Sequence, residues 1–188
     1  MNTIHQNEPF APVNKIQIAK ALSKLYITRA SFSILWVILV AALSSKSFTA
    51  SFILLLIYPL WDVIGTIADI RINKGNSVLP QYINLLISAI ATIAVALALK
   101  AGVPTALIVF GVWAIITGFI QLILGLRRRV LGGQWPMIIS GGQSIIGGTS
   151  FILLANNPTM GLTSLAGYAG FGAFYYLLAA WRLSKVKA

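Results

Sequence analysis

Residues 58–71 read Tyr-Pro-Leu-Trp-Asp-Val-Ile-Gly-Thr-Ile-Ala-Asp-Ile-Arg, at the end of a long apolar run. The stretch contains two of the three acidic residues of the chain, Asp62 and Asp69. In a helix, Asp62, Thr66 and Asp69 would share one face, because side chains three and four residues apart are neighbours. A carboxylate in hydrocarbon costs roughly 2.5–3.5 kcal/mol, so this face needs polar partners or a function.

The composition around this stretch is that of a membrane protein. Of the 188 residues, 58% are hydrophobic and 9% are charged, whereas soluble domains have about 45–50% apolar and about 25% charged residues. The chain has 14 Lys and Arg residues against three acids. They gather at the ends of apolar runs, so we interpret them as orientation signals. We expect membrane lipids as partners and no nucleic acid.

Six apolar segments follow one another along the chain, each close to the length of about 20 residues that a helix needs to cross a bilayer. Their ranges are 26–43, 49–70, 81–99, 103–126, 134–154 and 160–181. They predict an all-α, polytopic integral membrane protein with six transmembrane helices. We expect residues 1–14 to be a disordered cytoplasmic leader and residues 183–188 a basic cytoplasmic tail. Residues 15–25 alternate basic and apolar side chains, which suggests an interfacial helix or a docking helix for a partner protein.

The flanking basic residues predict the orientation of these helices. Twelve of the fourteen Lys and Arg residues fall on one side of the predicted spans, while Lys46 and Lys100 fall on the other. Cytoplasmic loops are enriched in Lys and Arg. We therefore expect a multi-pass protein of the bacterial inner (cytoplasmic) membrane with both termini in the cytoplasm.

An internal repeat divides the predicted membrane domain, residues 26–182, into three helical hairpins. Aligning Trp61 with Trp113, or Arg127 with Arg182, gives a period of about 52–55 residues. The hairpins cover about residues 26–72, 81–129 and 134–182. Because each would begin and end on the same side of the membrane, we expect a pseudo-threefold arrangement about an axis normal to the membrane.

Small residues mark candidate contact faces on the later helices. Gly111, Gly118 and Gly125 recur every seven residues, and Ser144 and Gly148 lie four apart. Small residues let membrane helices approach closely. Helix packing is the simpler interpretation of this pattern; a ligand groove or an oligomer contact is the alternative.

The hairpins combine a Gly with a Trp or Tyr early in the second helix and an Arg at its exit, and in this they resemble the HdeD-like family of small bacterial inner-membrane proteins. The resemblance covers about residues 26–182 and is best at residues 107–129 and 137–154. It implies six spans and a role in acid resistance or stress response, and it brings no catalytic residues. Residues 59–71 depart from it, because they are more charged than their counterparts in the other hairpins.

Two groups of charges near the predicted cytoplasmic face have structural interpretations. Arg29 and Asp69 would lie at similar depth on neighbouring helices, so we predict an ion pair between them; plain interfacial positions are the alternative. The run Arg127, Arg128 and Arg129 is interpreted as an orientation signal, with a site for anionic lipid headgroups as the alternative.

Asp62 lies deeper, about eight residues or roughly 12 Å from the end of its helix. Its candidate partners are the polar residues at similar depth, namely Ser88, Thr117, Gln143 and Ser144. If none of its partners is charged, desolvation favours the neutral acid, and Asp62 is then either a proton relay or a hydrogen-bonded packing residue. Gln121 and Gln143 are expected to form hydrogen bonds between helices.

No enzyme is expected, because no nucleophile is paired with a base, and no cofactor or metal site is predicted. The chain has no cysteine, and His5, in the leader, is its single histidine. Our first hypothesis is a non-enzymatic stress or acid-tolerance protein that binds lipid, a small ligand or a partner protein. The second is a small transporter or proton-conducting channel built around Asp62, and a homo-oligomer or a subunit of a larger membrane complex is a third. If the Asp62–Asp69 face, Gln121 and Gln143 converge on a water-filled cavity, the second hypothesis gains; if these side chains are buried dry between helices, the first stands.

Overall fold

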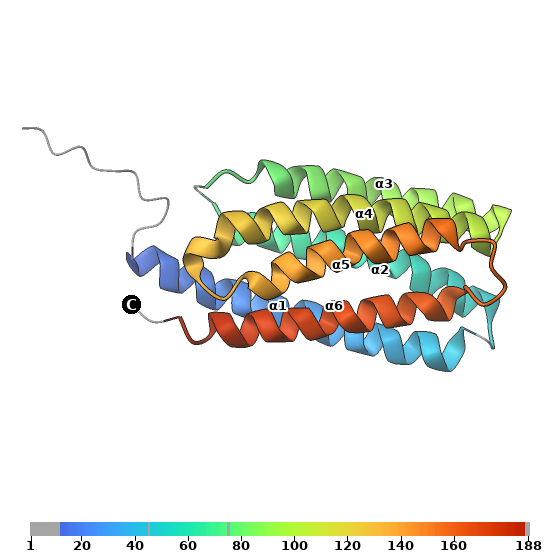
Figure 1. The fold of residues 1–188 in the computed structure, drawn as a ribbon, viewed down its shortest axis with the longest axis horizontal. Helices are drawn as coiled ribbons and strands as arrows, with labels where there is room; N and C mark the ends of the chain where they lie inside the picture. Colours follow the sequence, from blue (N-terminus) through green and yellow to red (C-terminus); the bar gives the residue numbers. More distant parts are fainter. Residues whose placement is uncertain (1–11, 45, 75, 187–188) are drawn as a thin grey trace, which may run out of the picture.

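The computed structural model describes residues 12–44, 46–74 and 76–186 (Figure 1). In these residues it contains helices and no β-strand. The helices are α1 (Pro12–Leu43), α2 (Phe48–Ile72), α3 (Leu79–Ala101), α4 (Val103–Arg127), the short 3₁₀ helix η1 (Arg128–Leu131), α5 (Trp135–Leu153) and α6 (Leu162–Leu183). The predicted leader lies almost wholly outside the described residues.

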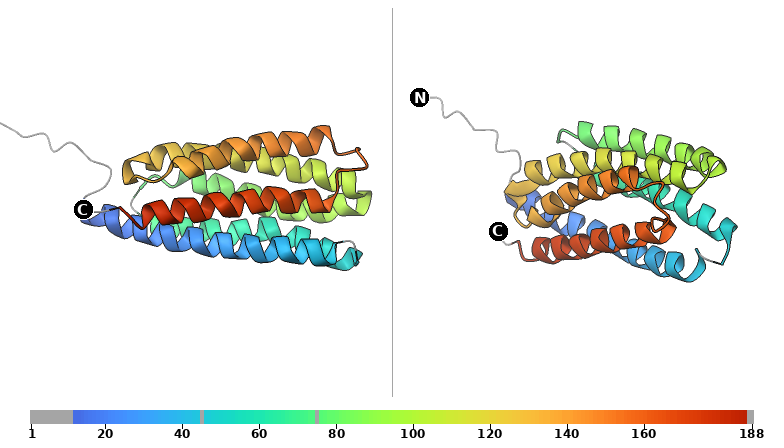
Figure 2. Two further views of the ribbon diagram at one scale, coloured as in Figure 1. Left: turned by 60° about the horizontal axis from the view of Figure 1, so that its bottom comes forward. Right: turned by 45° about the vertical axis from the view of Figure 1, so that its right-hand side comes forward.

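The six α-helices run side by side and close into a ring, in which α6 returns to pack along α1 (Figures 1 and 2). Going around this ring, adjacent helices form extensive and less extensive contacts in alternation. The pairs α2–α3, α4–α5 and α6–α1 contact each other more extensively than the pairs α1–α2, α3–α4 and α5–α6. Each predicted hairpin therefore packs more on its neighbours than on itself, and α5 and α6 contact each other least.

Four helical segments are long and apolar enough to cross a membrane, and they span Lys15–Leu43, Phe48–Ile72, Leu79–Ala101 and Val103–Leu131. The chain is therefore a helical membrane protein in character. Large apolar side chains are also exposed on the outer surface of all six helices, for example Ile38, Ile53, Ile93, Phe119, Ile146 and Phe174. A soluble monomer rarely exposes so continuous an apolar surface.

Local sequence explains where several of these helices begin. The Ser47 side chain caps α2 by accepting a hydrogen bond of 3.2 Å from the backbone N–H of Ala50. Helices α3, α4 and α5 each have a proline in their first turn, where the missing N–H costs nothing. Within α2, Pro59 removes one backbone donor. Close to it, Nε1 of Trp36 donates to the carbonyl of Leu54 over 2.7 Å.

Residues 15–25, for which the sequence suggested an interfacial or docking helix, form the first part of a longer helix. Helix α1 runs without a break from Pro12 to Leu43, because neither glycine nor proline interrupts residues 14–43. The apolar side of residues 15–25 packs inside the protein, where Ile18, Ala19 and Leu22 are buried with residues of α6 and η1. Its amphipathic pattern is thus explained by contact with the chain itself.

Two apolar cores occupy opposite ends of the ring. The first, which we call the aromatic core, contains Trp36, Phe110, Trp113, Phe151 and Leu165. Its rings meet edge to face, with centroids 4.9 Å apart for Phe110 and Trp113. The second, the basic-end core, lies at the start of α1 and the end of α6 and contains Ile18, Leu22, Leu131, Met137 and Leu183 among its buried residues. The layer between the two cores holds the polar residues described below.

The glycines of α4 pack against α5, as the simpler interpretation of their spacing predicted. A methyl group at Gly148 would lie 2.5 Å from the carbonyl oxygen of Gly111, and one at Gly118 would lie 2.8 Å from that of Gly141. Only glycine allows the two backbones to approach so closely. This contact makes α4 and α5 the most extensively packed pair of helices in the ring.

Candidate functional site

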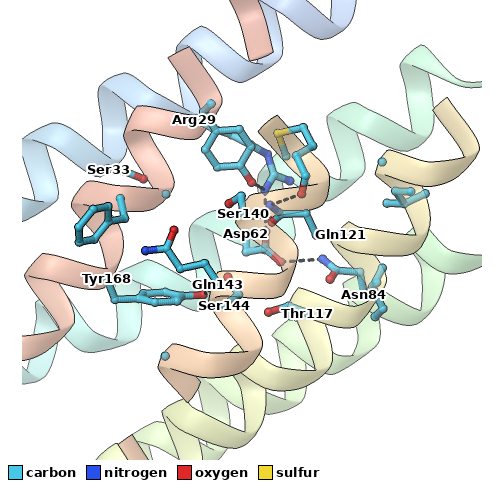
Figure 3. Close-up of a pocket in the computed structure, with 18 of the residues that line it drawn as sticks. Arg29, Ser33, Asp62, Asn84, Thr117, Gln121, Ser140, Gln143, Ser144 and Tyr168 are labelled. Carbon is cyan, nitrogen blue, oxygen red and sulfur yellow. Dashed lines mark hydrogen bonds and ion pairs between the residues drawn. The ribbon is translucent and has the colours of Figure 1, made fainter. Parts of the chain in front are cut away.

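A cavity of about 440 Å³ lies inside the ring, between the aromatic core and the basic-end core (Figure 3). On α1, for example, its lining residues extend from Tyr26 to Ser33, which precede Trp36 of the aromatic core along the helix. Sites for small molecules are usually about 300–1,000 Å³ in volume. All six helices contribute to the lining, and its polar side chains include Arg29, Ser33, Asp62, Thr66, Asn84, Thr117, Gln121, Ser140, Gln143, Ser144, Tyr168 and Tyr176.

Asp62 is fully hydrogen-bonded on the cavity wall. Nη1 of Arg29 donates to its Oδ1 over 2.7 Å. Its Oδ2 accepts from Nδ2 of Asn84 over 2.6 Å and from Oγ of Ser88 over 2.7 Å, and Figure 3 shows the bond from Asn84. The sequence correctly named Ser88 as a partner, but it missed Arg29 and Asn84. Because Asp62 has a cationic partner, the premise for an isolated neutral acid does not hold.

Arg29 is held from three sides by residues of α2 and α6. Besides its bond to Asp62, Nη1 donates to the Tyr176 hydroxyl over 3.1 Å, and Nη2 donates to Oγ1 of Thr66 over 3.4 Å. A methyl group at Gly65 would lie 2.6 Å from the guanidinium carbon of Arg29. Gly65 therefore makes room for the guanidinium. Its position three residues after Asp62, on the same helix face, was the signal that sequence reasoning could have used.

The predicted ion pair between Arg29 and Asp69 is not formed. Arg29 pairs with Asp62, and Asp69 pairs with Arg128. The reason is depth. Because α1 starts at Pro12, Arg29 lies well inside the bundle, whereas Asp69 is seven residues, or about 10 Å, closer than Asp62 to the end of α2.

Asp69 anchors a second polar cluster near the basic end of the ring. Arg128 binds its carboxylate through both terminal nitrogens, with Nη1 3.0 Å from Oδ2. Nδ2 of Asn73 donates to Oδ1 over 2.7 Å. Nη1 of Arg128 also donates to the Tyr26 hydroxyl over 3.5 Å, and that hydroxyl donates to Oε1 of Gln134 over 3.4 Å. The cluster ties α1, α2, η1 and the start of α5 together.

The arginine run predicted as a headgroup site therefore divides in two. Arg128 is buried and paired with Asp69, so it cannot reach a lipid surface. Arg127 and Arg129 are exposed, and for these two the headgroup site stays a prediction.

The remaining predicted polar residues lie on the same cavity wall (Figure 3). Oγ of Ser144 and the hydroxyl of Tyr168 are 3.0 Å apart, joining α5 to α6. Nε2 of Gln121 donates to the Met137 carbonyl over 3.3 Å, which confirms the predicted bond between helices for that residue. Gln143 lines the cavity. Ser144 and Gln143 do not bind Asp62 directly, although all three face the same space.

Two residues that line the cavity each have a buried polar atom with no hydrogen-bond partner among the described residues. The atoms are Nε1 of Trp61, a donor, and Oε1 of Gln81, an acceptor. Leaving a buried donor or acceptor unsatisfied costs about 1–3 kcal/mol. Trp61 also stacks on Phe32, with ring centroids 4.3 Å apart, as expected for a packing residue.

The cavity reaches the outer surface of the protein between α5 and α6. Three of its lining residues, Ile146, Gly167 and Phe171, are exposed, and all three belong to these two helices. Ile146 and Phe171 are among the most exposed large apolar residues, at 69% and 58%. The opening, which we call the α5–α6 mouth, therefore lies in the apolar outer surface and not at either end of the ring.

The charges on the cavity wall balance. Among the described lining residues, the charged ones are Arg29, Asp62, Asp69 and Arg128, and they form the two ion pairs. The described residues contain no group of three or more His, Cys, Asp or Glu side chains able to hold a metal ion. What this arrangement offers is hydrogen bonding inside a neutral, partly aromatic cavity. Comparison with protein-family models, curated proteins and solved structures finds no match to the chain.

Proposed function

We propose that this chain is a non-enzymatic protein of the bacterial inner membrane that binds a small molecule or lipid inside its ring of six helices. The observation that carries the proposal is the polar cavity of about 440 Å³ that lies between two packed apolar cores and opens sideways. Buried polar side chains are expensive in a membrane and usually mark a functional site.

We propose that all six helices span the bilayer as three hairpins, with both termini in the cytoplasm. Supporting this, α5 and α6 lie in the ring beside the four helices that are long and apolar enough to cross a membrane, and they expose Ile146 and Phe174. The contacts between adjacent helices are also less extensive within each of the three hairpins than between neighbouring hairpins, so one pattern occurs three times around the ring. In this topology Lys46 and Lys100, at the opposite end from the other basic residues, would face the periplasm.

Single-cysteine labelling tests the topology directly, because the chain has no native cysteine. A membrane-impermeant thiol reagent should label Lys46→Cys and Asn156→Cys in intact cells. It should label Arg129→Cys only after the inner membrane is opened. Labelling of Arg129→Cys from outside, or protection of Asn156→Cys, would overturn the arrangement.

Binding is favoured over a proton-conducting channel by the contacts of Asp62 and by the apolar cores on both sides of the polar layer. A relay needs a carboxylate that can contact water or a second proton carrier, whereas both oxygens of Asp62 already accept hydrogen bonds, from Arg29, Asn84 and Ser88. A conduit also needs a polar path, and an apolar core lies at each end of the cavity. The convergence of Asp62, Gln121 and Gln143 on one space keeps a small transporter as the alternative proposal.

A role in acid or stress tolerance rests on the resemblance to the HdeD-like family alone, and it is offered as part of the proposal on that basis. The same holds for a homo-oligomer or a partner protein in the membrane. Survival at acid pH of a strain lacking this chain, with and without complementation, tests the stress role separately from binding.

Native mass spectrometry of the full chain, released from a mild detergent, tests the binding function. We expect the wild-type protein to retain an extra non-protein mass. Gln143→Trp, which fills the cavity, should lose this mass. Gly142→Trp is the matched control, because a Cβ at Gly142 has no atom within 4 Å. Equal retention by the two variants, or no bound mass in the wild type, would contradict the proposal.

A further inference from the structure

We infer that the molecule bound in this cavity is an uncharged amphiphile, whose hydrogen-bonding headgroup sits among the polar side chains and whose apolar tail leaves through the α5–α6 mouth. The inference rests on the proposed binding function and adds the chemical class of the ligand and its route of entry. Three independent features of the cavity support it.

The first feature is the zero net charge of the cavity wall. Each positive side chain on the cavity wall already has a carboxylate partner, Arg29 with Asp62 and Arg128 with Asp69. An anionic or cationic headgroup would have to compete with one of these pairs or remain unpaired in a site of low dielectric constant. Removing one partner of a buried pair is strongly unfavourable. The wall is therefore complementary to a neutral headgroup.

The second feature is the presence of unsatisfied hydrogen-bonding atoms of both kinds. Nε1 of Trp61 is a buried donor without a partner among the described residues, and Oε1 of Gln81 is a buried acceptor in the same state. The whole Gln81 residue is only 2% exposed. The amide of Gln143 also lines the cavity. A carbonyl, ester or hydroxyl headgroup matches these atoms without carrying charge.

The third feature is the position and composition of the mouth. Ile146 and Phe171 border it on either side, and Gly167 leaves the space between them open, since a Cβ there would meet no atom within 4 Å. The helices that form the mouth contact each other least of all adjacent pairs. An apolar chain leaving through this gap would continue along the apolar outer surface of α5 and α6.

A matched pair of lipids tests the charge argument. The full chain in detergent micelles is titrated with sn-1,2-dioctanoylglycerol and with dioctanoylphosphatidate, which differ by the anionic phosphate. Decylubiquinone serves as a second neutral probe with a flat carbonyl headgroup, and comparing it with the glycerol lipid tells which neutral headgroup fits. We expect at least one neutral probe to bind about tenfold or more tightly than the phosphatidate, which corresponds to about 1.4 kcal/mol.

Two variants of α6 test the route of entry. Gly167→Phe places a ring in the mouth and should weaken binding of the neutral probe by about tenfold or more. Gly161→Phe, at the N-cap of α6, is the matched control: its Cβ also meets no atom within 4 Å, and Gly161 lines neither the cavity nor the surface groove that contains Gly167 and Phe171. It should bind the probe as the wild type does. Equal weakening, or no weakening, in the two variants would refute entry between α5 and α6.

Asp62→Asn tests the same charge argument by changing the protein instead of the lipid. The substitution leaves Arg29 without a carboxylate partner, so the preference should shift at least about tenfold toward the phosphatidate. If the wild type binds phosphatidate as tightly as both neutral probes, the inference fails while the binding function stands. If the wild type retains a native mass but binds neither neutral probe, the inference again fails alone. If the wild type retains no mass and binds no probe, the inference and the proposed binding function are both refuted.

Discussion

Removing the guanidinium of Arg29 is the perturbation that tests the centre of this structure most directly. Arg29→Met keeps most of the apolar stem and removes three hydrogen bonds, to Asp62, Tyr176 and Thr66. It leaves the Asp62 carboxylate with two neutral donors, Asn84 and Ser88.

The size of the effect follows from burial. The side chains of Arg29 and Asp62 are 11% and 17% exposed, so water cannot replace the lost partner fully. Breaking a buried ion pair from one side costs about 3–5 kcal/mol. Because the pair borders a cavity, we expect Arg29→Met to lower the free energy of unfolding by about 3 kcal/mol, the low end of that range.

A double-mutant cycle separates the ion pair from ordinary packing. Unfolding is driven by SDS in mixed micelles and followed by tryptophan fluorescence. Arg29→Met combined with Asp62→Asn removes both charges, so the double variant should be no less stable than Arg29→Met alone. Arg127→Met, at an exposed arginine, is the control and should change stability by less than about 0.5 kcal/mol. Additive losses from Arg29→Met and Asp62→Asn would refute the proposed coupling.

Three further predictions concern other contacts, and unfolding in SDS measures each. Gly148→Leu should lower the free energy of unfolding by more than about 3 kcal/mol, because the added side chain forces α4 away from α5. Gly142→Leu should leave the stability nearly unchanged, since a Cβ there has no atom within 4 Å. Equal losses of stability in the two variants would contradict the close packing of α4 and α5. Asp69→Asn should lower the free energy of unfolding by about 3 kcal/mol, because it leaves the buried Arg128 without its carboxylate partner. A variant as stable as the wild type would show that this ion pair is unimportant. Trp36→Phe should lower the free energy of unfolding by about 1 kcal/mol, because it removes the hydrogen bond from Trp36 Nε1 to the Leu54 carbonyl, and an unchanged stability would refute that contribution.

The sequence by itself determined the class of protein and the positions of its helices. Five of the six predicted segments match α2 to α6 to within two residues at each end. This agreement is possible because length, apolarity and terminal proline, glycine or arginine are local properties of each segment. The exception is α1, which begins at Pro12 instead of residue 26 and whose amphipathic first part packs against other helices of the protein.

The helix face of Asp62, Thr66 and Asp69 was also predictable, and all three residues line the cavity. Only the tertiary structure decided which charges pair. Arg29 meets Asp62, and Arg128 meets Asp69, because the axial offset between neighbouring helices sets which side chains share a depth. That offset depends on how all six helices pack around the ring, and no single segment encodes it.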